Sequence, residues 1–182
     1  MTYDILEKQY GKRDTNFLRE SGKFIPRDIL ESDIYVNDFW KSRIKTLVQV
    51  SGIFDLPHGG HTTYLREASY FGDELIVSLN SDASTERCKG KGHPYMNFIH
   101  RALILCSMEM VDYVTGFDES DPSTIIGIIA PDIYVKGWDT IIDTNTPELK
   151  TIFKTSSLRL TSEEGHLSFH TSDILEKIRN GK

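Results

Sequence analysis

The sequence has few cysteines, no long apolar run and no excess of basic residues. Its 182 residues include only two cysteines, Cys88 and Cys106, too few for a disulfide framework and in keeping with a reducing compartment. The formal net charge of −6 argues against broad nucleic-acid binding, which needs a basic face. No apolar run approaches the length of a membrane span, and the opening "MTYDILEKQY" is too polar for a signal peptide. We therefore expect a cytoplasmic protein that binds neither membranes nor nucleic acid.

Strand-like and helix-like patterns alternate from about residue 46 onward. Short runs typical of buried strands lie at 46–51, 74–79, 111–117, 132–137 and 157–162. Apolar residues at helical spacing lie at 60–71, 96–110, 121–130 and from Thr171 onward. This alternation predicts an α/β fold: a Rossmann-like open parallel sheet of about five strands with helices on both faces. Such sheets bind ligands at the carboxyl ends of their strands.

The first 45 residues do not follow this alternation. They contain seven aromatic residues among many charges: Tyr3, Tyr10, Phe17, Phe24, Tyr35, Phe39 and Trp40. That content is too aromatic for a disordered tail. We expect a mainly helical extension over 1–45 that packs on a nucleotide-binding domain over 46–182 or on a second subunit, as a dimerisation arm. A substrate lid is the alternative.

The stretch "VSGIFDLPHGGHTTYLREA" holds two histidines where a strand becomes a helix. His58 and His61 are three residues apart and therefore lie on the same side of the first helical turn. A helix N-terminus presents unpaired N–H groups that suit a phosphate, and glycines such as Gly60 let the backbone approach a ligand closely. Two imidazoles there can stabilise charge on an α-phosphate during displacement. Zinc binding is the alternative, but it leaves the glycines unexplained and helical zinc pairs are commonly four residues apart.

Other polar residues follow the predicted strands. Asn80 and Asp82 come directly after the strand at 74–79, at the expected ligand edge, and Lys89 belongs to a cationic segment that follows them. Taken alone, such a charged segment is a solvated surface. Lys136 ends the strand at 132–137, where it either binds a phosphate or marks the sheet edge.

Three further residues have a plain and a functional interpretation. Thr171 and Ser172 can cap the last helix and leave N–H groups and hydroxyls for a phosphate. Asp55 is a turn-forming aspartate on residue chemistry alone.

Four blocks, in this order, resemble the cytidylyltransferase-like nucleotidyltransferases with their H-x-G-H signature. The blocks are "GIFDLPHGGHTTYL", "GDELIVSLNSDASTERCKG", "HRALILCSMEMVDYV" and "PDIYVKGWD". The resemblance covers 47–139, with a weaker echo at 168–178. It is closest to the adenylyltransferase domain of bifunctional heptose kinase/adenylyltransferases and looser to glycerol-3-phosphate cytidylyltransferases.

The resemblance implies roles for individual residues. It implies catalytic roles for His58, His61 and Lys89, and a substrate-phosphate contact for Lys89 and Arg101. It places Asp55 near Mg²⁺, which would accompany the nucleotide. The nucleotide contacts that it implies are Gly52, Phe54, Asp55, Gly60, Asn80, Asp82, Lys136, Thr171 and Ser172.

The implied activity is transfer of a nucleoside monophosphate from an NTP, with ATP favoured, to a phosphorylated sugar, with release of pyrophosphate. CTP with glycerol 3-phosphate or another polyol phosphate is one alternative, and a non-catalytic nucleotide-binding protein is another. Two departures leave the base and acceptor open: Trp138 replaces a usual glycine, and His170 interrupts a Ser/Thr-rich run. Relatives are commonly dimers, so the resemblance also implies a homodimer.

Overall fold

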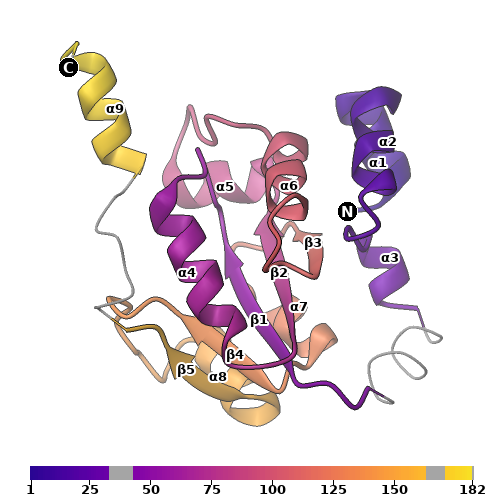
Figure 1. Ribbon diagram of the computed structural model, residues 1–182, viewed down its shortest axis with the longest axis vertical. Coiled ribbons are helices and arrows are strands. Elements are labelled where there is room, and N and C mark those ends of the chain that lie inside the picture. The colour runs from indigo at the N-terminus through magenta and orange to yellow at the C-terminus, as the bar shows by residue number, and fades with distance from the viewer. Residues whose placement is uncertain (33–42, 163–170, 182) are drawn as a thin grey trace.

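A single five-stranded sheet organises the molecule. The computed structural model describes residues 1–32, 43–162 and 171–181 (Figure 1). The strand order is β3-β2-β1-β4-β5, and every neighbouring pair is parallel. The strands are β1 (Leu47–Gly52), β2 (Glu74–Asn80), β3 (Tyr113–Phe117), β4 (Ile133–Lys136) and β5 (Ser157–Leu160). The chain builds outward from β1 to β3 and then returns to the other side of β1, so the strand order reverses between β1 and β4, where such sheets bind ligands.

Helices cover both faces of the sheet, as the alternating pattern predicts. The helices of this part of the chain are α4 (Gly59–Ser69), α5 (Asp82–Lys89), α6 (Phe98–Cys106), α7 (Ser123–Ile129), α8 (Pro147–Thr155) and α9 (Thr171–Arg179), the last of which has no buried residue. Val48 and Val50 pack in one cluster with α4 and α6, whereas Leu47 packs in another with α7. Successive side chains of a strand point to opposite faces, so a strand of continuous apolar residues needs a helical layer on each side.

The N-terminal segment is helical and packs against the sheet domain. It forms α1 (Tyr3–Tyr10), α2 (Lys12–Glu20) and α3 (Arg27–Leu30). Leu6, Leu18 and Phe24 are buried in the same cluster as α4 and α6. The amide of Ile25 donates to the carbonyl of Val114 at 2.8 Å, which ties the segment to β3.

Parts of the N-terminal prediction lie outside the described residues, namely the aromatic residues Tyr35, Phe39 and Trp40. The helical extension itself is confirmed. A domain boundary after residue 45 and a role in dimerisation stay predictions.

Two helices were not predicted, and a third begins differently. The segment interpreted as a cationic loop contains α5, whose N-cap Ser81 accepts a hydrogen bond from the amide of Ser84 at 3.0 Å. The second, α8, has Thr146 as its N-cap and a proline at its first helical position. The third, α7, begins at Ser123 rather than at 121; its N-cap is Pro122, and the Asp121 side chain accepts from the amide of Ser123. Polar residues leave α5 with weak apolar spacing. In α8, Leu149, Ile152 and Phe153 lie at helical spacing, so the sequence held a signal for this helix that the analysis missed.

No helix within the three described ranges has the length and apolar character needed to cross a membrane.

Candidate functional site

The N-terminus of α4 is capped by its own two histidines. The Nδ1 atom of His58 accepts a hydrogen bond from the amide of Gly60 at 3.1 Å, and the Nδ1 atom of His61 accepts from the amide of His58 at 3.4 Å. The ring centroids are 4.0 Å apart. Because each Nδ1 atom is an acceptor, each neutral ring carries its proton on Nε2. Both imidazoles are therefore held as Nε2–H donors on one turn of helix.

The loop between β1 and α4 is folded tightly beneath this pair. Phe54 and Leu56 have φ values of 47° and 46°, in the left-handed region that is unfavourable for bulky residues. Phe54 is buried, with its ring 5.3 Å from that of His61. A Cβ atom on Gly52 would lie only 2.9 Å from the Phe54 ring, so only glycine leaves that ring in place. Gly52 leaves room for the Phe54 ring, and that ring packs beside the His61 imidazole and fixes its position.

A cavity of about 1120 Å³ lies at the carboxyl ends of β1 and β2. A second cavity of about 330 Å³ shares Gly52, Phe54, His61 and Thr171 with it. Together the two are large enough for a nucleotide and a small second ligand. The predicted site residues that line one or both are Gly52, Phe54, Asp55, His58, Gly60, His61, Asn80, Lys89, Thr171 and Ser172.

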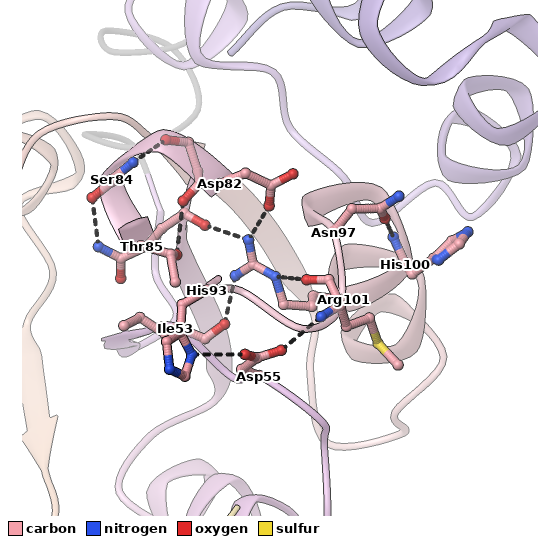
Figure 2. A network of polar contacts seen from close by, with 12 residues as sticks. Ile53, Asp55, Asp82, Ser84, Thr85, His93, Asn97, His100 and Arg101 are labelled. Carbon is pink, nitrogen blue, oxygen red and sulfur yellow. Dashed lines mark hydrogen bonds and ion pairs between the residues drawn. The ribbon is translucent and has the colours of Figure 1, made fainter. Parts of the chain in front are cut away.

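Arg101 does not reach this cavity, contrary to the predicted substrate-phosphate contact. Its side chain is fully buried, and the guanidinium donates to the carbonyls of Met96, Ile53 and Asn80. It also forms an ion pair with Asp82 at 2.7 Å. Figure 2 shows the guanidinium with its bonds to Ile53 and Asp82. A buried charge needs this full set of partners, so Arg101 lies behind the cavity wall and holds it.

Asp82 and Lys136, predicted to contact nucleotide, are also engaged within the protein. Asp82 pairs with Arg101, and Lys136 donates to the Oε2 atom of Glu148 at 2.7 Å. Neither is among the residues that line the two cavities, although Glu148 does line the larger one. The strand-end position was predicted for both, but the direction of the side chain depends on partners far along the chain.

Asp55 joins three segments around the cavity. Its Oδ2 atom accepts from the amide of Tyr95 at 2.7 Å, its Oδ1 atom from the amide of Met96 at 2.9 Å, and its carbonyl from the hydroxyl of Thr171 at 2.9 Å. Within the described part of the chain, no group of three histidine, cysteine or acidic residues could hold a metal ion. Each Asp55 carboxylate oxygen keeps a further lone pair, but without such a group around it Asp55 does not by itself make a protein-held metal centre.

Several cavity residues were missed by the sequence analysis. His93 and Tyr95 line the larger cavity from the loop before α6, and Glu176 and Arg179 line it from α9. The α9 pair has a signal in the sequence, because both lie at helical spacing from Ser172. Two residues, Trp138 and His170, depart from the family pattern. The backbone amide of Trp138 donates to the Thr161 hydroxyl. His170 lies outside the described residues.

A parallel α/β sheet with a strand-end cavity and paired imidazoles at a helix N-terminus is an architecture of the nucleotidyltransferase class. The chain belongs to the cytidylyltransferase-like family, whose model matches residues 50–178. This confirms the family that the four blocks predicted.

The relatives include proteins named bifunctional protein HldE. That of Edwardsiella ictaluri is 35% identical over 172 residues, which are 94% of this chain and 34% of that protein. That of Wolinella succinogenes is 49% identical over 100 residues, 55% of this chain and 21% of that protein. The chain thus spans about a third or less of these curated relatives.

Solved structures share the fold. The lipopolysaccharide core biosynthesis protein of Thermoplasma volcanium is 29% identical with a TM-score of 0.56, and the match covers 65% of this chain and 97% of that one. A pantoate-β-alanine ligase of Francisella tularensis, crystallised with an ATP compound and β-alanine, has a TM-score of 0.52 at 13% identity. That match covers 87% of this chain and 77% of that one and shows the fold alone.

Proposed function

We propose that this protein transfers a nucleotidyl group from an NTP, with ATP favoured, to a phosphorylated sugar and releases pyrophosphate. The observation that carries this proposal is the pair of Nε2–H donors at the start of α4, where His61 lines both cavities and His58 the smaller one. The HldE relatives support it, because they belong to the class of protein that the resemblance implied. The Thermoplasma volcanium protein is named for lipopolysaccharide core biosynthesis, which favours a sugar-derived acceptor.

The reaction needs positioning and charge stabilisation rather than a protein nucleophile. A phosphate monoester is largely ionised near neutral pH, so its oxygen can attack the α-phosphorus without a general base. The new bond forms between that oxygen and the α-phosphorus, and the bond to the leaving pyrophosphate breaks in line. His58 and His61 would donate Nε2–H bonds to the oxygens that gain charge, and the positive end of the α4 dipole would add to them.

The remaining cavity residues would hold the two ends of the ligand pair. Lys89, at the end of α5, would pair with the outer phosphates or with the acceptor phosphate. Ser172 would bring its hydroxyl, and the start of α9 its amides, to the same phosphates. Thr171 lines the cavity beside it, with its own hydroxyl donated to the Asp55 carbonyl. Magnesium, if present, would arrive bound to the triphosphate, since the described residues form no metal site of their own. A homodimer is proposed for the full chain on the resemblance alone.

The proposal is tested by measuring pyrophosphate release with ATP and CTP, each against a panel of sugar phosphates and glycerol 3-phosphate. Release with ATP and a sugar phosphate is the expected result. Release only with CTP and glycerol 3-phosphate would replace the substrate assignment while keeping the chemistry. Nucleotide binding by calorimetry without turnover for any pair would identify a non-catalytic binding protein and overturn the proposal.

A further inference from the structure

The walls of the cavity meet at one buried group. The Arg101 guanidinium donates from Nε to the Met96 carbonyl at 2.8 Å, and its two terminal nitrogens donate to the carbonyls of Ile53 at 2.6 Å and Asn80 at 3.0 Å. Ile53 and Asn80 both line the larger cavity. The Met96 amide donates to the Asp55 carboxylate, and Asp55 also lines the cavity. One side chain therefore sets the relative position of three segments that are far apart in the sequence.

The charge of Arg101 is balanced by Asp82 at the start of α5. Among the described residues, Asp82 supplies the one carboxylate within ion-pair distance of this guanidinium, at 2.7 Å. The Asp82 side chain is 23% exposed, so water can compete for it. If the carboxylate turned away, a fully buried cation would lose its counter-charge, which is strongly unfavourable.

The N-terminal segment holds that carboxylate in place. The hydroxyl of Tyr10, the last residue of α1, donates to the Oδ2 atom of Asp82 at 2.7 Å, while Oδ1 faces Arg101. Burial, and then the bond to Asp82, raise the pKa of the Tyr10 hydroxyl, so it stays a proton donor throughout the usual pH range. Its partner lies 72 residues away, in the domain that contains the cavity.

We propose that Tyr10 is a positioning residue for the reaction proposed above, through which α1 acts on Asp82, Arg101 and the cavity walls. Without the hydroxyl, the Oδ2 atom would bond to water and the Asp82 carboxylate would gain rotational freedom. The Arg101 guanidinium and the three carbonyl groups that it binds would then lose their fixed positions as well. A loss of alignment of this kind lowers turnover more than substrate binding. The activity readout of this inference rests on the proposed function. A second readout, amide hydrogen exchange, is independent of that function.

The test compares Tyr10→Phe with Tyr3→Phe, a matched variant on the same helix. Tyr3 also gives its hydroxyl to the protein, at 3.2 Å to the Phe24 carbonyl, but it does not touch Asp82. With the full chain and the best substrate pair, we expect Tyr10→Phe to lower kcat about tenfold with little change in KM, because a bond to a charged acceptor is lost. Tyr3→Phe should keep the wild-type kcat.

Amide hydrogen exchange gives the second readout. The amides of Tyr95 and Met96 are bonded to Asp55 next to the Arg101 cluster, so peptides over 93–97 should exchange about tenfold faster in Tyr10→Phe than in Tyr3→Phe. Equal exchange in the two variants overturns the inference, and so does equal kcat when the wild type is active. A wild type without transfer activity contradicts the proposed function instead, and exchange alone then decides whether Tyr10 positions the cavity walls.

Discussion

At the scale of single residues, the proposed function depends on which ring nitrogen of His58 and His61 carries the proton. The two Nδ1 atoms accept backbone amides at the start of α4, which leaves the protons on Nε2. The spacing of His58 and His61 predicted a shared side of the helix. It did not predict that each ring would cap the backbone and so be held in one tautomer.

We expect His61→Ala to lower turnover by about 10²-fold or more, the range seen when a charge-stabilising donor is removed. His100→Ala is the matched control, because His100 is exposed on α6 and faces Asp14 at 4.0 Å, away from the cavities. Both variants should keep the wild-type circular dichroism spectrum. A His61→Ala protein that releases pyrophosphate at near wild-type rates would refute the assigned role.

The two cysteines should differ in reactivity with thiol reagents. Burial raises the pKa of the Cys106 thiol to about 11, so near pH 8 it stays protonated and inaccessible. Cys88 is exposed and lines the larger cavity. The native protein should react at one thiol, and saturating nucleotide should slow that reaction. Rapid labelling of Cys106, located by peptide mass mapping, would contradict the described packing of α6.

At the scale of elements, the turn from β1 into α4 decides the shape of the site. A Cβ atom on Gly52 would press on the Phe54 ring, which rests against His61. Gly52→Ala should therefore lower kcat at least tenfold, since a small displacement of a catalytic group is costly. The measurement is steady-state pyrophosphate release.

Gly127→Ala in α7 is the control for that substitution. Its new methyl group would meet only the Thr151 side chain, at an ordinary 3.9 Å. Alanine is the better helix former, so this variant should gain about 0.5–1 kcal/mol in the free energy of unfolding and keep its activity. Equal activity of the two glycine variants would show that the turn does not position His61.

At the scale of the whole molecule, the N-terminal helices belong to the core of the sheet domain. Leu18 is fully buried, whereas its neighbour Phe17 is 49% exposed. Leu18→Ala should lower the free energy of unfolding by about 2–5 kcal/mol through the cavity that it leaves, and Phe17→Ala by less than about 1 kcal/mol. Urea unfolding measures both.

The same pair of variants distinguishes packing within the chain from packing between chains. If α2 packed on a second subunit instead, the decrease in the free energy of unfolding caused by Leu18→Ala would depend on protein concentration. Light scattering on the full chain tests the proposed homodimer directly, with 20.8 kDa as the mass of one chain.

The sequence by itself determined the alternation of strands and helices, and with it the parallel sheet and the ligand edge. Periodicity is a local property, and the histidine pair, its glycines and the strand before them are neighbours along the chain. The helical character of α5 was less visible, because polar residues dilute its periodic signal. That of α8 was present in the sequence, as an N-cap threonine, a proline and apolar residues at helical spacing.

Only the tertiary structure decided what the remaining charged residues do. Arg101, Asp82 and Lys136 stand where a phosphate contact was expected, yet each has a partner inside the protein. Those partners are chosen by the sheet order and by the packing of α1, which bring distant segments together. A buried charge takes whichever acceptors the fold places beside it, and no spacing along the chain specifies them.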